Sequence, residues 1–217
     1  MQLTSLVRSL HRLAAATLFV AGSAASVSAQ VPTAVDFLGN NSIVTVRFVG
    51  SEAADRSTLA YQIGAIGSFS AGGTWTDLFT NNGAGASAPG TQIQIGNVSS
   101  GQNVFFRLTN TTQGVGPNFT NYRFFSGPAS RNPDNALHMA VSAGSGLAAS
   151  GGGTFTTAFS FEDRSATIVP IADFDYNDLR FEIANVSTVV PEPSTYILMA
   201  SGLAGLGMMA RRRRNNA

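Results

Sequence analysis

Acidic residues crowd into one stretch of the sequence, FEDRSATIVPIADFDYNDLRFEI, which begins at Phe161. Six of the 12 acids of the whole chain lie between positions 162 and 182. Carboxylates this close repel one another unless something neutralises them. A hard ion such as calcium suits such ligands, because it takes about six to eight oxygens. The candidate calcium ligands are Glu162, Asp163, Asp173, Asp175, Asn177 and Asp178.

The spacing of these residues argues against an EF-hand. Asp173, Asp175 and Asn177 imitate the first half of its loop, D-x-D-x-N. However, Asp178 stands where that loop requires glycine, and Ala184 stands where its bidentate glutamate belongs. The acidic stretch therefore needs another way to gather its ligands.

A β-hairpin would bring the two ends of the acidic stretch together. If a strand ending near Phe161 pairs with one starting near Tyr176, the acids after the first lie beside the acids before the second. Period two places Asp173, Asp175 and Asn177 on one side, while Asp178 points the other way or lies in a turn. The alternative to a metal site is a solvated acidic turn, capped by hydrogen bonds to backbone amides.

The remainder of residues 30–189 alternates between apolar and polar residues, as β-strands do. In QIQI, Ile93 and Ile95 share one face, and NVFFRLTN behaves in the same way. The pattern recurs over 44–48, 59–63, 137–141, 155–161 and 179–183. Clusters of Gly, Asn, Ser and Pro separate these segments, and no strong amphipathic helix is visible. We predict an all-β domain of about eight to ten strands, an antiparallel β-sandwich with a jelly-roll-like topology.

Two further sets of side chains within this domain could bind ligands. His138, its only histidine, falls opposite apolar neighbours, which favours an exposed or hydrogen-bonded structural role over a catalytic one. Trp75, Tyr122 and Phe125 are candidates for an exposed aromatic platform that would bind sugar, although burial in the core is the more common fate.

Residues 1–29 have the pattern of a secretory signal peptide with a helical core. Two arginines precede an apolar stretch, and small residues end at Ala29, where we expect signal peptidase to cut. An amphipathic first helix of the fold is the alternative, but it does not explain why the first 35 residues contain no acid.

Residues 190–217 form a second, separate signal. Pro191, Glu192, Pro193 and Ser194 precede the uncharged segment 196–210, and Arg211, Arg212, Arg213 and Arg214 follow it. As a short helix the apolar segment reaches about 22 Å, less than the roughly 30 Å hydrocarbon core of a membrane. It therefore suits a transient stop better than a permanent tail anchor, which is the alternative.

This order of motif, apolar run and basic cluster closely resembles the PEP-CTERM sorting signal. The resemblance implies export across the inner membrane of a Gram-negative bacterium and a transient membrane-anchored precursor. It also implies cutting near the PEP motif by an exosortase-type enzyme. The prolines at 191 and 193 agree with this role, because they keep the chain extended.

Residues 131–183 also resemble a bacterial extracellular domain of unknown function that often precedes such tails. Its "ED … DxDYND" signature is matched by Glu162, Asp163, Asp173, Asp175, Tyr176, Asn177 and Asp178. His138 fits the upstream histidine of that family more loosely. The resemblance implies a β-rich exported module that binds calcium, with no activity attached to it.

Composition excludes several other functions. Residues 30–190 hold seven arginines against eleven acids, a formal net charge of −4, so nucleic-acid binding has no electrostatic support. No cysteine is present, and no common catalytic motif appears, so we expect a protein that is not an enzyme. The leading hypothesis is a structural or adhesive protein of the cell envelope or of an extracellular biofilm matrix. A carbohydrate-binding module acting on exopolysaccharide is the alternative, and a glycoside hydrolase using two carboxylates is the third.

Overall fold

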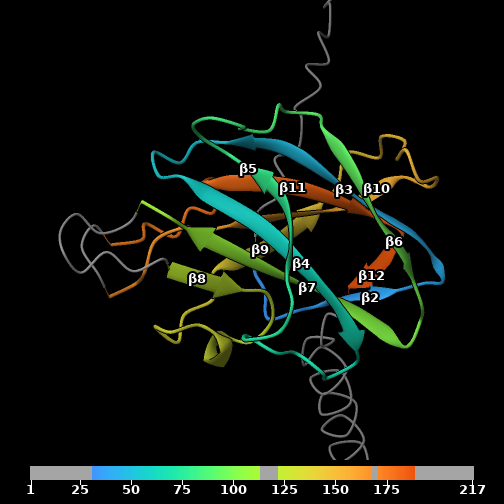
Figure 1. Cartoon of the computed structure of the whole chain (residues 1–217), viewed down its shortest axis with the longest axis horizontal. Coiled ribbons are helices and arrows are strands. Elements are labelled where there is room, and N and C mark those ends of the chain that lie inside the picture. Colours follow the sequence, from blue (N-terminus) through green and yellow to red (C-terminus); the bar gives the residue numbers. More distant parts are fainter. Residues whose placement is uncertain (1–30, 113–121, 168–170, 189–217) are drawn as a thin grey trace, which may run out of the picture.

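The computed structural model describes residues 31–112, 122–167 and 171–188, which form two antiparallel β-sheets packed as a sandwich (Figure 1). The strand order in the first sheet is β1 (Val31–Pro32), β9 (Met139–Ala143), β10 (Phe155–Phe161), β11 (Leu179–Ala184), β3 (Ser42–Ser51) and β6 (Gln92–Val98). The order in the second is β12 (Val186–Thr188), β2 (Phe37–Gly39), β7 (Gln102–Asn110), β4 (Ser57–Ala65) and β5 (Thr76–Thr80), with β8 (Tyr122–Phe125) beside β7. A short 3-10 helix, η1 (Ala129–Arg131), follows β8.

The predicted antiparallel β-sandwich is therefore confirmed, while the jelly-roll-like topology stays a prediction. The described ranges contain 12 strands, more than expected, because β1, β2 and β12 have only two or three residues each and are too short to show alternation. No helix among the described residues is long and apolar enough to cross a membrane. The predicted signal-peptide helix and the apolar segment 196–210 lie outside the described residues.

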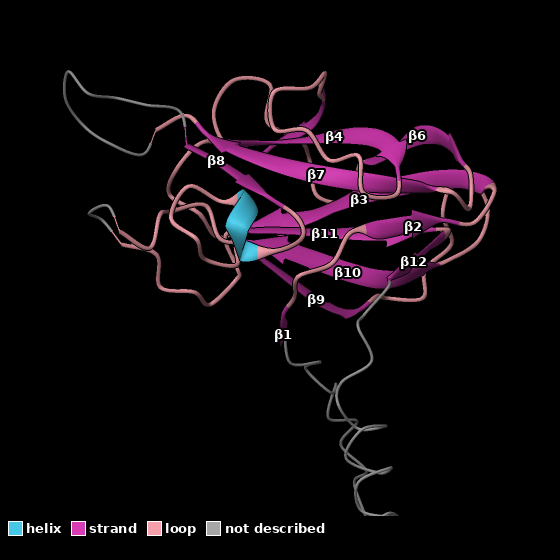
Figure 2. Ribbon diagram, turned by 90° about the horizontal axis from the view of Figure 1, so that it is seen from below, coloured by secondary structure: helices cyan, strands magenta, loops and turns pink. Residues whose placement is uncertain are grey.

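Phenylalanines fill the space between the two sheets, which Figure 2 shows as two layers. Phe159 on β10 contacts Phe106 on β7 and Phe37 on β2, with ring centroids 4.6 and 5.2 Å away. Phe181 on β11 packs beside it at 5.2 Å. Each fully buried ring stabilises the fold by about 1.5–3 kcal/mol. These side chains therefore determine which face of each strand points into the core.

The predicted hairpin is present, with a later start to its second strand. β10 and β11 pair antiparallel, with Phe161 opposite Leu179. Residues 172–178 do not extend β11, because Phe174 and Tyr176 both adopt left-handed backbone conformations, with φ of 56° and 55°. The acidic segment before β11 is therefore an irregular loop, and period two does not apply to it.

Candidate metal site

One group of carboxylates gathers at the loop end of the β10–β11 hairpin, where residues 162–178 connect the two strands. Glu162 and Asp163 directly follow β10, and Asp178 directly precedes β11. The backbone N–H of Asp163 donates to Oδ2 of Asp178 at 3.0 Å, which closes the end of the hairpin. One carboxylate oxygen from each of the three residues lies within 4.8 Å of the others. We call Glu162, Asp163 and Asp178 the inner group.

A second group shares one member with the first and lies closer to solvent. Glu162, Asp173 and Asp175 also offer oxygens within 4.8 Å of one another, and the two aspartates are exposed. We call these three residues the outer group. A pocket of about 310 Å³ is lined by five of the six predicted ligand residues, Glu162, Asp173, Asp175, Asn177 and Asp178.

Two details of this arrangement concern residues just before β11. Asp178 joins Glu162 and Asp163 in the inner group, whereas Asp173 and Asp175 belong to the outer group. Asn177 donates both its backbone N–H and its side-chain amide to the carboxylate of Asp175. It therefore orients a member of the outer group.

In the inner group, each carboxylate has one oxygen held by a neutral donor. Glu162 Oε2 accepts from the N–H of Phe174, and Asp163 Oδ2 accepts from the hydroxyl of Ser57, both at 3.0 Å. Asp178 Oδ2 is held by the N–H of Asp163, as described above. The remaining oxygen of Asp163, Oδ1, is buried and has no hydrogen-bond partner among the described residues. A buried carboxylate oxygen without a partner is costly, and a bound cation would satisfy it.

Burial and repulsion from neighbouring carboxylates work against ionisation of Glu162 and Asp163. Glu162 and Asp163 are each only 1% exposed. Burial, reinforced by the adjacent carboxyl of Asp178, raises the pKa of Glu162 to about 9 and that of Asp163 to about 8. The guanidinium of Arg164, which also lines the pocket, pairs with Asp55 at 2.8 Å and makes no ion pair with the inner group. In the absence of a cation, protons hold these carboxyls together.

Buried polar residues of the second sheet donate hydrogen bonds to Asp163. Ser57 begins β4 and lies opposite Asn110, the last residue of β7. The side-chain amide of Asn110 donates to the carbonyl of Asp163 at 2.8 Å, and Asn81 accepts from the N–H of Ser57 at 2.7 Å. Asp163 itself follows β10 of the first sheet. The site therefore joins the two sheets at this end of the sandwich.

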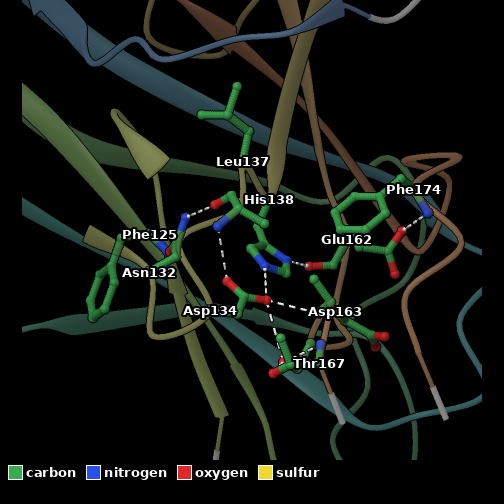
Figure 3. Close-up of polar contacts among 12 residues, drawn as sticks. Phe125, Asn132, Asp134, Leu137, His138, Glu162, Asp163, Thr167 and Phe174 are labelled. Atoms are coloured by element: carbon green, nitrogen blue, oxygen red, sulfur yellow. Dashed lines mark hydrogen bonds and ion pairs between the residues drawn. The ribbon is translucent and has the colours of Figure 1, made fainter. Parts of the chain in front are cut away.

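His138 supports the same site from another side (Figure 3). It is fully buried, and its ring stacks on Phe124 with centroids 3.8 Å apart. Its ring nitrogens lie 2.9 Å from Oδ2 of Asp134 and 3.2 Å from the carbonyl of Glu162. Burial lowers the pKa of His138, although Asp134 and the Glu162 carbonyl act to raise it. The ring is therefore neutral at pH 7 and donates to one of these two oxygens.

The expectation that His138 is exposed is wrong, and only its hydrogen-bonded structural role agrees with the structure. The alternation argument assumed a strand from Leu137, but β9 begins at Met139. His138 lies just before that strand, where the chain turns the ring inward beneath the acidic loop.

Several supporting residues could not be found from the sequence. Ser57, Asn110 and Asp134 stand far from the acidic stretch and carry no local motif. Ser57 and Asn110 meet only through the register of β4 with β7. Asp134 is locked in place by the N–H of Ala166 at 2.8 Å as well as by His138. Burial acts to raise the pKa of Asp134, but these hydrogen bonds outweigh it and lower the pKa.

The predicted processing residues belong to the two ends of the chain. Ala29, the segment from Pro191 to Ser194 and the cluster from Arg211 to Arg214 lie outside the described residues.

The described part of the chain is thus a β-sandwich with a carboxylate pocket of the kind that holds a cation. The family model of the PEP-CTERM protein-sorting motif matches residues 189–214. The chain therefore carries this motif at its C-terminus, and proteins with the motif are exported and membrane-anchored, then processed by exosortase. No curated protein and no solved structure matches the chain.

Proposed function

We propose that this protein is a structural or adhesive component of the cell envelope or extracellular matrix of a Gram-negative bacterium. The PEP-CTERM motif supports export and exosortase processing. In this proposal, signal peptidase removes residues 1–29 and exosortase cuts near Pro191–Pro193. The β-sandwich is the part that remains outside the inner membrane and acts there.

Calcium would stabilise this β-sandwich through the inner group of carboxylates. The observation that carries the proposal is the buried Asp163 Oδ1, which has no partner among the described residues and lies in a set of hard oxygen ligands. When bound, the cation would neutralise carboxylates that otherwise need protons. Ser57 and the N–H of Phe174 hold two of these carboxylates in fixed orientations, so the residues fit a cation without rearrangement of their donors.

A structural role fits this site better than glycoside hydrolysis does. Hydrolases of sugars place two carboxyls roughly 5–9.5 Å apart with the sugar between them. Here three carboxylates converge within 4.8 Å, and Asp163 is buried beneath the pocket rather than facing a substrate. We therefore propose that the protein is not an enzyme.

Thermal unfolding of the exported protein, purified from the cell envelope, tests calcium binding. At a calcium concentration of about a hundred times Kd, binding to the native state alone adds about 2.7 kcal/mol. For a domain of this size we expect Tm to rise by about 5–10 °C in millimolar calcium relative to chelator. Asp163→Asn, which keeps an acceptor for Ser57, should remove most of that rise.

Asp77→Asn is the matched control, because this acid on β5 is 71% exposed and lies outside both carboxylate groups. It should keep the full calcium effect. Identical melting curves in calcium and in chelator for the unmodified protein would show that the acidic loop is only a capped turn.

A further inference from the structure

A second hollow, distinct from the carboxylate pocket, lies beside β8 and η1. This groove of about 690 Å³ is lined by Tyr122, Arg123, Phe125, Ser130 and Arg131, among others, and none of its described lining residues is acidic. β8 flanks β7 in the second sheet, as Figure 1 shows. Phe125 lies opposite Arg107 of β7, on the face away from the core-facing Phe106 and Leu108. The groove therefore opens on the outer face of the sandwich.

Aromatic rings form a small second cluster along this outer face. Phe125 contacts Phe69 and Trp75, with ring centroids 5.2 and 5.7 Å away. Phe125 is 6% exposed, while Tyr122 and Trp75 are half-buried, so the three aromatic residues do not form the open platform considered from the sequence. Phe125 instead provides a packed aromatic wall of the groove, of the kind against which the apolar face of a sugar ring packs, while the ring of Tyr122 stacks on Phe124.

One of the arginines near this wall carries a positive charge that no acid among the described residues neutralises. Arg131 is paired, since its guanidinium bonds both carboxylate oxygens of Asp36 at 2.7 and 2.8 Å. Arg123, in contrast, is exposed and has no ion-pair partner among the described residues, and the preceding residues 113–121 contain no Asp or Glu.

A second arginine on the same face adds to this positive charge. Burial and the nearby charge of Arg123 lower the pKa of Arg107. Its only ion pair among the described residues is a long one of 3.7 Å, to the exposed Asp77. Two neighbouring guanidinium groups with so little counter-charge form a favourable place for an anion.

We propose that this groove binds a carboxylate-bearing polysaccharide, with a uronate carboxylate on the guanidinium of Arg123 and a sugar ring against Phe125. This inference rests on the proposed function, because export brings the domain into contact with extracellular glycans. A nucleic acid fits less well, because residues 30–190 carry a formal net charge of −4 that repels a dense polyanion. An acidic peptide would satisfy the arginine but offers no sugar ring for the aromatic wall.

Isothermal titration calorimetry of the exported protein with tetragalacturonate tests this assignment. The titration is run in chelator, so that calcium cannot bridge the protein and the uronate. We expect one binding site, weakened by added salt. Arg123→Gln should weaken binding by about tenfold or more, because it removes a charge-assisted hydrogen bond. Phe125→Leu should weaken it, because the groove loses its aromatic wall.

Arg180→Gln is the matched control, because it removes one 40% exposed arginine from β11 of the other sheet. It should leave tetragalacturonate binding unchanged. An equal loss in Arg123→Gln and Arg180→Gln would overturn the assignment, as would equal binding of neutral cellotetraose or no binding at millimolar sugar. Tighter binding of oligothymidylate or tetraglutamate would overturn it in favour of another polyanion.

The proposal for the groove and the proposal for the metal site can be tested independently. Asp163→Asn should lose the calcium effect on Tm and keep tetragalacturonate binding, whereas Arg123→Gln should do the opposite. A protein that binds calcium but no uronate would overturn only the groove.

Discussion

Two glutamates of the same hairpin, Glu162 and Glu182, solve the problem of a buried carboxylate in different ways. Glu182 on β11 is 5% exposed and pairs with Arg47 of β3, whose Nε and Nη2 lie 2.8 and 2.6 Å from its Oε2. The N–H and hydroxyl of Ser145 also donate to it. Glu162 is 1% exposed, but its neighbours are other carboxylates and no guanidinium pairs with it among the described residues.

Glu182 is thus a structural contact whose charge is neutralised by the chain itself, whereas Glu162 belongs to a site that requires a proton or a bound cation. The middle of the hairpin is neutralised by the chain itself, so its stability should not depend on ions in solution. The loop end of the hairpin needs protons or a cation. The four predictions below test this contrast, in order of decreasing expected effect.

Breaking the internal ion pair should have the largest effect. Arg47→Met leaves Glu182 buried without its cation, which we expect to cost about 3–5 kcal/mol of unfolding free energy. Urea unfolding in calcium and in chelator should show the same loss in both conditions. Arg180→Gln, which breaks only an exposed pair with Glu52, should cost less than about 1 kcal/mol. A loss for Arg47→Met that calcium restores would contradict the contrast.

Removing the histidine beneath the acidic loop should rank second. His138→Ala deletes a fully buried ring, its stacking on Phe124 and its hydrogen bond to Asp134 or to the carbonyl of Glu162. We expect a loss of about 2–4 kcal/mol by urea unfolding. A change below 1 kcal/mol would indicate that the ring lies at the surface after all.

The two ends of this contrast also show what the sequence can and cannot predict. Alternation and charge clustering are local signals, and they were enough for seven of the 12 described strands, for the β10–β11 hairpin and for the acids at its end. The partners of those acids depend on register between strands distant in sequence, as with Ser57 and Asn110. The sequence placed His138 on the wrong side because alternation carries information only inside a strand. β9 starts at Met139, one residue after His138. The pairing of Glu182 with Arg47 likewise appears only once β11 lies beside β3.

Raising the pH should destabilise the metal-free protein through the inner group. The pKa values of Glu162 and Asp163 are about 9 and 8 in the fold, above the ordinary value near 4 of an unfolded carboxyl. Between the unfolded and the folded pKa values, the native state binds more protons than the unfolded state. The free energy of unfolding therefore falls as the pH rises through the folded pKa values. In chelator, Tm should fall by several degrees from pH 7 to pH 9.

Millimolar calcium should flatten that decline, because the cation replaces the protons. Thermal melts at matched ionic strength measure both series. The range above pH 7 avoids titration of His138, whose pKa is lowered from its usual value near 6.5. If Tm fell with pH by the same amount with and without calcium, the carboxyls that titrate would not be the ligands of the cation.

The smallest effect should come from the outer group. Asp173 is exposed and belongs to the outer group, whose only member in common with the inner group is Glu162. If the inner carboxylates provide most of the affinity for the cation, the loss of Asp173 should weaken binding only slightly. We expect Asp173→Asn to reduce the calcium-induced rise in Tm by less than half, whereas Asp163→Asn removes most of it. The reason is dielectric: the charge on a buried carboxylate is poorly screened, while that on an exposed one is weakened by water and salt. Calorimetric melts of both variants across a calcium titration distinguish the two positions. If Asp173→Asn abolished the effect and Asp163→Asn did not, the cation would belong to the outer group, and the buried Asp163 would be held by protons alone.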